Sequence, residues 1–273
     1  MRMQLQAPAR RNRRRAATRR TATRRTATRQ AQPARDRKIV AIRLVVGLIA
    51  VWGLIALLGL LETQVLNTGA AHRADLGVDV WLAAHRTAFW NTATLVGTTM
   101  ATTVTVIAVT AGVALLLRWL VGRWHESLVL VTVMIGEIVL FLAASETIHQ
   151  NRPPVHRLDQ APPTSSYPSG HTAAAVALYG CLAVLVIWIY GRRPAARVAA
   201  AVLALIPFFV GFSRLYRGMH YPSDVVAGAL LGGLWLLLVM TTLLRRQPRP
   251  ADGSQAAIGS RPGRGTRHRA ATR

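Results

Sequence analysis

The hydrophobic residues of this 273-residue chain form six long apolar runs separated by polar segments. A helix needs about 20 residues at 1.5 Å each to cross the roughly 30 Å hydrocarbon core of a bilayer. The runs are close to that length, so they predict six transmembrane helices and an all-α, integral-membrane bundle. Their predicted bounds are 39–61, 92–117, 128–144, 172–190, 198–212 and 225–244.

The two ends of the chain have the opposite character, because they are strongly basic and poor in apolar residues. Residues 1–38 and 245–273 hold 22 of the 34 Lys and Arg residues, and 18–30 repeat with a period of five as TRRTATRRTATRQ. Such segments cannot bury enough apolar surface to offset the entropy of folding. We therefore predict disordered tails over 1–38 and 245–273 that flank a membrane domain over 39–244.

The overall composition excludes several classes of protein. The chain is 52% hydrophobic yet has a formal net charge of +24, which is not typical of a compact soluble domain. Its single cysteine, Cys181, excludes an intrachain disulfide and a cysteine zinc site.

The distribution of basic residues predicts the topology. An even number of spans places both tails on one side of the cell membrane, and the positive-inside rule makes that side cytoplasmic. Segments 62–91, 145–171 and 213–224 then face outward. Anionic lipid headgroups lie nearest to cytoplasmic Arg-rich tails, so we expect the bilayer surface, ahead of nucleic acid, as the partner of the tails.

Three clusters of polar residues fall at the outer end of the predicted bundle, although they are far apart in sequence. They are Asn-Arg-Pro-Pro at 151–154, Tyr-Pro-Ser-Gly-His at 167–171 and SRLYRGMHYPSD at 213–224. Because each lies next to a predicted span end on the same side, the topology brings them to one membrane face.

Four of these residues suit a phosphate group. Arg152 and Arg214 offer forked donors that match phosphate oxygens. Ser169 and Gly170 lie where the fourth predicted helix begins, and the free N–H groups and positive dipole end of a helix start bind anions. We predict these four as the phosphate-binding residues.

Two histidines and an aspartate supply reactive groups beside them. Asp224 follows His220 by four residues, and a carboxylate that holds one ring nitrogen orients the other toward the substrate. We predict that His220 attacks phosphorus to form a phosphohistidine, while His171 protonates the leaving alkoxide and then activates water. No carboxylate cluster suits magnesium, so we expect neither a metal nor another cofactor.

Taken in order, the clusters resemble the three-part signature of the type 2 phosphatidic acid phosphatase family, lipid phosphate phosphatases related to vanadium haloperoxidases. That signature reads Lys-x6-Arg-Pro, Pro-Ser-Gly-His and Ser-Arg-x5-His-x3-Asp. Its second part is complete at 168–171 and its third at 213–224, and the resemblance covers roughly 90–245. The resemblance implies a six-span helical bundle, a covalent phosphohistidine on His220, acid–base work by His171 and no metal requirement.

One position departs from the signature. The Lys of the first part falls on Ser145, which offers one neutral hydrogen bond in place of a positive charge. Either two arginines suffice, or Arg157 or His149 supplies the extra contact; otherwise the activity is low or the substrate differs.

Three functions follow from these observations. The leading hypothesis is a membrane lipid phosphate phosphatase, a phosphoric monoester hydrolase that converts phosphatidic acid to diacylglycerol and phosphate on the outer face. An enzyme alternative is a phosphatase that removes the terminal phosphate of a polyprenyl (undecaprenyl) diphosphate carrier. The third is a non-catalytic lipid-binding membrane protein, for which Ser145 is the only support.

Overall fold

The computed structural model describes residues 37–66 and 69–244 of the chain. The predicted disordered tails lie outside the described residues, apart from Arg37 and Lys38, which begin the first helix. The chain divides into two compact units, Met1–Ala50 and Val51–Arg273. In the described part of the first unit, apolar side chains such as Ile42 and Val46 are more than half exposed, as lipid-facing residues are.

The described residues form helices and no strand. A first helix over Arg37–Gln64 widens at its end into a π-helical turn, η1 (Glu62–Leu66). The other elements are α2 (Ala70–Ala84), α3 (Ala88–Thr99), α4 (Thr103–Val121), α5 (His125–Thr147), α6 (Gly170–Tyr190), α7 (Pro194–Tyr216) and α8 (Pro222–Leu243). The first helix and α4–α8 are long and apolar enough to cross a membrane, which confirms the predicted six-span, all-α architecture.

The second span begins later than predicted. The apolar run over 92–117 predicts one helix, but the structure ends α3 at Thr99 and starts α4 at Thr103. Threonine hydroxyls cause the break by competing for backbone groups: Thr99 donates to the Val96 carbonyl (2.8 Å), and Thr102 accepts from the Thr105 amide (3.5 Å) as an N-cap. As a result, α3 belongs to the segment outside the spans.

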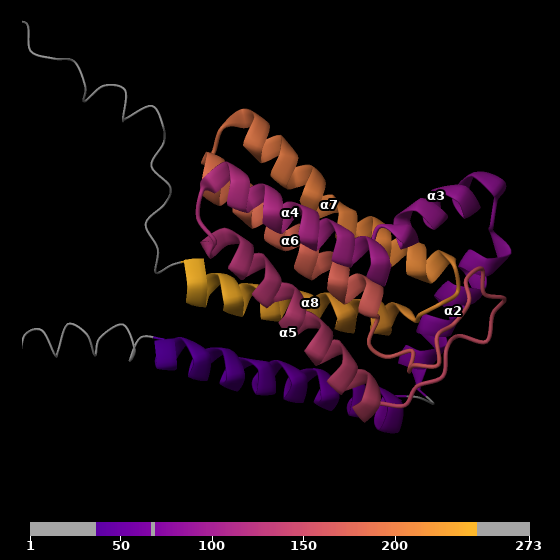
Figure 1. The fold of residues 1–273 in the computed structure, drawn as a ribbon. Coiled ribbons are helices and arrows are strands. Elements are labelled where there is room, and N and C mark those ends of the chain that lie inside the picture. Colours follow the sequence, from indigo (N-terminus) through magenta and orange to yellow (C-terminus); the bar gives the residue numbers. More distant parts are fainter. Residues whose placement is uncertain (1–36, 67–68, 245–273) are drawn as a thin grey trace, which may run out of the picture. The chain divides into compact units, whose positions relative to one another are not determined.

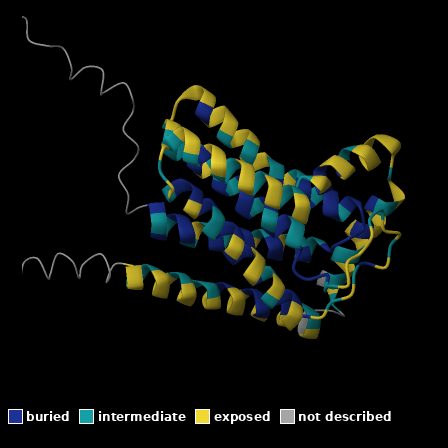
Figure 2. Ribbon diagram, in the orientation of Figure 1, coloured by how far each residue is buried: buried dark blue, intermediate teal, exposed yellow. Residues whose placement is uncertain are grey.

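Helix α6 is the centre of the bundle, in contact with α5, α7 and α8. Figure 2 shows buried residues where these helices meet and exposed residues along the outward faces of α3, α4 and α7. Gly228 and Gly232 of α8 face the backbone of α6, where a side chain at either position would collide with the carbonyls of Ser169 and Ala173. This small-xxx-small spacing allows the two helix backbones to touch.

One end of the bundle carries all three polar clusters, and we call it the site end. Helices α5 and α7 finish there, α6 and α8 begin there, and α2, α3 and the 148–169 segment gather around them (Figure 1). We call the other end, where α4 turns into α5, the opposite end.

Candidate active site

The site end collects the seven predicted site residues from five places in the fold. Arg152 lies in the 148–169 segment, and His220 lies between α7 and α8. The last turn of α7 holds Arg214, and the first turn of α8 holds Asp224. The N-cap and first turn of α6 hold Ser169, Gly170 and His171.

His220 is the best-defined reactive group. It is 4% exposed, and its Nδ1 lies 2.8 Å from the Ser166 carbonyl oxygen. Burial, together with the charges of Arg214 and Arg152, holds the pKa of His220 well below its usual value, so the ring is neutral. Because a carbonyl only accepts hydrogen bonds, Nδ1 carries the ring hydrogen, and Nε2 is left unprotonated.

Asp224 reaches His220 through Ser166. The Asp224 carboxylate accepts from the Ser166 hydroxyl (2.5 Å) and the Tyr221 amide (2.9 Å), whereas it lies 3.7 Å from His220 Nδ1. The sequence predicted that the Asp224 carboxylate would bond directly to the His220 ring. In the structure, the Ser166 carbonyl is the hydrogen-bond partner of His220 Nδ1 instead. Ser166 had no motif to identify it, since its role arises from a contact across 58 residues.

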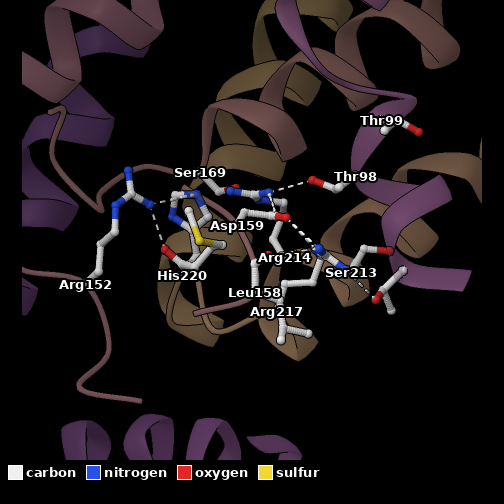
Figure 3. A network of polar contacts seen from close by, with 12 residues as sticks. Thr98, Thr99, Arg152, Leu158, Asp159, Ser169, Ser213, Arg214, Arg217 and His220 are labelled. Atoms are coloured by element: carbon white, nitrogen blue, oxygen red, sulfur yellow. Dashed lines mark hydrogen bonds and ion pairs between the residues drawn. The ribbon is translucent and has the colours of Figure 1, made fainter. Parts of the chain in front are cut away.

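Arg152 lies beside the unprotonated nitrogen of His220. Its Nη1 donates to the Met219 carbonyl (2.7 Å) and lies 3.5 Å from His220 Nε2 (Figure 3). Burial lowers the pKa of Arg152, but a guanidinium starts so far above neutrality that it remains a cation. A fixed positive charge thus adjoins the lone pair.

Arg214 is only 3% exposed, yet it is incompletely bonded. Its Nη1 donates to Thr98 Oγ1 (2.5 Å) and to Asp159 Oδ2 (3.0 Å), while its Nε is buried without a hydrogen-bond partner. The Nε–Nη2 side of a guanidinium forms a two-pronged donor suited to an oxyanion. Neither Thr98 nor Asp159 was identified from the sequence; the only signal was that Asp159 is the sole acidic residue of the 148–169 segment.

The start of α6 completes the cluster. Ser169 is fully buried; its amide donates to the Asp224 carbonyl (3.0 Å), and its hydroxyl lies 3.0 Å from Thr172 Oγ1. His171 lies in the first turn of α6, close enough to Arg214, His220 and Arg152 to interact with them electrostatically. The structure therefore brings the predicted phosphate-binding and reactive residues together.

The position of the missing lysine remains a neutral one. Ser145 is buried on α5, while His149 and Arg157, the two expected substitutes, are exposed to solvent. Within residues 37–66 and 69–244, no three His, Cys, Asp or Glu side chains are grouped so that they could hold a metal ion.

A cavity of about 410 Å³ lies at the site end, lined by none of the seven predicted site residues. Leucine and valine side chains such as Leu58 and Val226 line it together with polar groups. Two further lining residues, Tyr167 and Ser223, are the sequence neighbours of Ser166 and Asp224. It therefore has an apolar part and a polar part, as an amphipathic ligand does.

Part of the chain matches a known family and several curated proteins. Residues 126–248 match the family model of the PAP2 superfamily. The chain is 32% identical over 111 residues to an undecaprenyl-diphosphatase of Sulfolobus acidocaldarius (39% of this chain, 47% of that protein). It is 33% identical over 78 residues to phosphatidylglycerophosphatase B of Bacillus subtilis (27% and 37%) and 36% identical over 80 residues to lipid A 1-phosphatase of Rhizobium etli (29% and 30%).

The fold agrees with that assignment. A transmembrane PAP2-type phosphatidylglycerolphosphate phosphatase from Bacillus subtilis superposes with a TM-score of 0.65 at 20% identity, over 73% of this chain and 97% of that one. The aligned segments span less than two thirds of each curated relative named above. The six apolar helices and this fold indicate a multi-pass membrane protein. The resemblance seen in the sequence is confirmed over residues 126–248, which match the PAP2 superfamily.

Proposed function

We propose that this chain is a membrane lipid phosphate phosphatase that hydrolyses a phosphate monoester such as phosphatidic acid through a phosphohistidine, without a metal. One observation carries the proposal. His220 keeps its hydrogen on Nδ1, against the Ser166 carbonyl, and its lowered pKa leaves an unprotonated Nε2 beside Arg152. A neutral imidazole with its lone pair next to a partly buried cation is a nucleophile poised toward an anion.

The reaction proceeds in two displacements. His220 Nε2 attacks phosphorus and the phosphorus–oxygen bond to the lipid breaks; His171 donates a proton to the departing alkoxide, which leaves as the lipid alcohol. A water molecule then gives its proton to His171 and attacks phosphorus. The phosphorus–nitrogen bond breaks, so inorganic phosphate leaves and His220 is regenerated.

Donors around the phosphate stabilise both transition states. The open edge of Arg214 and the guanidinium of Arg152 face the place where charge develops, and Ser169 with the Gly170 amide offers the start of α6. Removing one such donor typically costs about 100- to 1,000-fold in rate.

The lipid nature of the substrate has separate support. The partly apolar cavity at the site end suits a molecule with a polar head and a hydrocarbon tail. Three relatives carry the names undecaprenyl-diphosphatase, phosphatidylglycerophosphatase B and lipid A 1-phosphatase, all of which denote lipid phosphates.

Release of inorganic phosphate by the purified full chain in detergent with excess EDTA tests the proposal. We expect release from phosphatidic acid, loss of at least about 1,000-fold in His220→Ala, and normal activity in His85→Ala, whose imidazole is exposed on the C-cap of α2. Loss of wild-type activity on chelation would contradict the metal-free mechanism, and an active His220→Ala would contradict the nucleophile.

A polyprenyl diphosphate is the second candidate substrate, favoured by the similarity to an undecaprenyl-diphosphatase. His220 would then attack the terminal phosphorus, and the leaving group would be the lipid monophosphate. Rates measured side by side on phosphatidic acid, phosphatidylglycerol phosphate and undecaprenyl diphosphate separate the candidates. Absence of release from all three would favour the non-catalytic, lipid-binding alternative.

We also propose that the site faces the extracytoplasmic side, with both basic tails in the cytoplasm against anionic headgroups. The support is the charge distribution along the chain. Arg157→Cys places a thiol on an exposed position of the site end. It should react with a membrane-impermeant maleimide in intact cells; reaction only after permeabilisation would reverse the orientation.

A further inference from the structure

Asp159 lies at the centre of the site without belonging to any part of the family signature. It sits in the 148–169 segment, and its carboxylate lies between Arg214 and Arg217 (Figure 3). Its Oδ2 accepts from Arg214 Nη1 (3.0 Å), and its Oδ1 accepts from Arg217 Nε (2.8 Å) and Nη2 (2.6 Å). One carboxylate therefore joins two buried guanidinium groups.

Arg217 is the fixed partner of this bridge. It is 5% exposed, and its Nη1 donates to the Asn91 carbonyl (3.1 Å) and to Thr94 Oγ1 (3.3 Å) on α3. Its Nη2 also donates to the Leu158 carbonyl (3.2 Å), and its own carbonyl accepts from the Leu158 amide (3.1 Å). All three side-chain nitrogens of Arg217 are committed to the protein, so none is left to bind a substrate.

Arg214 is held on one side and open on the other. Thr98 and Asp159 take Nη1, which fixes the plane of the rigid guanidinium. The buried Nε has no hydrogen-bond partner and lies on the opposite, Nε–Nη2 edge. The two acceptors of Nη1, Thr98 and Asp159, therefore fix the direction of the open Nε–Nη2 edge of Arg214.

The charge of Asp159 persists across the physiological range of pH. Burial alone would raise its pKa, but the hydrogen bond from Arg217 and the charges of Arg214 and Arg217 outweigh burial and lower it. The carboxylate also offsets one of two buried positive charges, which would otherwise repel each other.

We propose that Asp159 is a positioning residue of the phosphate site: by bridging the anchored Arg217 to Arg214, it aims the open edge of Arg214 at the substrate phosphate. The inference deepens the proposed function and rests on it, because it assigns that edge to the phosphate. Asp159 itself does not touch the substrate.

Two measurements on the full chain in detergent test the role: the affinity for orthovanadate by titration calorimetry, and kcat and KM on phosphatidic acid. Asp159→Asn keeps the shape of the side chain but replaces one accepting oxygen with an amide donor. We expect vanadate to bind at least about 10-fold more weakly and kcat to fall by about 10- to 100-fold with a smaller change in KM. Asp159→Glu should recover part of the loss, and Glu146→Gln, at an exposed acid near the end of α5, should change neither quantity.

A second arm separates positioning from general destabilisation. Asp159→Asn is combined with Arg214→Lys, which removes the guanidinium that Asp159 aims. If Asp159 acts through Arg214, the double variant should have nearly the kcat/KM of Arg214→Lys alone. Losses that add in full would overturn the inference, as would wild-type vanadate affinity in Asp159→Asn.

Failure of the proposed function gives a different result. A wild type that binds vanadate but hydrolyses no lipid phosphate would contradict the proposed function. The role of Asp159 would still be tested by comparing the vanadate affinities of the wild type and Asp159→Asn. A wild type that does not bind vanadate would overturn both. If Asp159→Asn does not fold, Thr98→Val removes the other acceptor of Arg214 Nη1 and should weaken vanadate several-fold; unchanged affinity there would overturn the inference.

Discussion

The two ends of the helical bundle treat their buried polar groups differently. At the opposite end, the fully buried Glu126 accepts from Arg123 Nε with both oxygens (3.0 and 3.1 Å), and Ser127 donates to the Ala114 carbonyl (2.6 Å). These partners are at most 13 residues apart. His125 Nε2, at the start of α5, is buried there without a hydrogen-bond partner in the described part of the chain.

The site end relies on distant partners and leaves more groups open. Both oxygens of Asp79, Arg214 Nε and Asp224 Oδ1 are buried without a hydrogen-bond partner in the described part of the chain. A buried unpaired polar group costs roughly 1–3 kcal/mol. The opposite end therefore favours stability. The site end is less stable because it keeps unpaired polar groups, and a bound anion would complete the hydrogen bonds of Arg214.

Among the variants that compare the two ends, the largest effect is expected from removing the open edge of Arg214. Arg214→Met should lower kcat/KM by about 100- to 1,000-fold, because a donor to the developing negative charge is lost. Arg118→Met is the matched control, since Arg118 lies at the opposite end, over the Trp124 ring. Equal losses in the two variants, measured as phosphate release, would show that the ends do not differ as described.

Asp79 should make the stability of the site end depend on pH. Burial, with the nearby Asp75 and Asp224 charges, raises the pKa of Asp79 to about 8. Because this folded-state pKa lies above the unfolded value, wild-type stability falls as pH rises from about 4 to about 8. Asp79→Asn should therefore stabilise the protein more at pH 8 than at pH 5, by about 2 kcal/mol.

Thermal melting of the two proteins at both pH values measures this difference. The exposed Glu146→Gln should show no such trend. An advantage of Asp79→Asn that shrinks toward pH 8 would mean that the carboxylate has a charged partner in solution.

Ser166→Ala, also at the site end, should lower kcat by less than Arg214→Met does. It removes the 2.5 Å hydrogen bond to Asp224 but keeps the backbone carbonyl that holds His220. A hydrogen bond to a charged group contributes about 1.5–3 kcal/mol, so kcat should fall by about 10-fold. Thr164→Ala, in the same segment, should change kcat less than about 2-fold; similar losses in both would point to a general loosening of the loop.

The smallest effect is expected at the opposite end and on stability alone. Glu126→Gln weakens the bidentate pair with Arg123, which is 35% exposed, so water replaces part of the lost interaction. We expect the free energy of unfolding to fall by about 1 kcal/mol with unchanged kcat per folded molecule. A clear loss of kcat would mean that the two ends are coupled.

The sequence predicted the features that depend on local signals. The apolar runs that begin at 172 and 225 place the starts of α6 and α8 within three residues of the observed positions, Gly170 and Pro222. The assembly of the predicted site residues at one end followed from the alternation of the spans.

The supporting residues could not be predicted because tertiary contacts alone define them. Thr98 meets Arg214 across 116 residues, and Asp159 meets it across 55. Thr98 also lies on α3, which the apolar pattern had merged with the following span. The pattern of apolar residues does not reveal a helix break made by threonines, because the threonine methyl group is compatible with an apolar run.

The contact through Gly228 and Gly232 has a mechanical consequence. His171 lies on α6, and His220 lies two residues before the start of α8. The backbones of these two helices are in contact at Gly228 and Gly232. When the surrounding bilayer thins or thickens, such a pair can tilt as a unit but cannot slide, so the spacing of the imidazoles is insulated from lipid thickness. We expect kcat to be nearly the same in vesicles of short- and long-chain lipids, and a marked dependence would show that the pair shears.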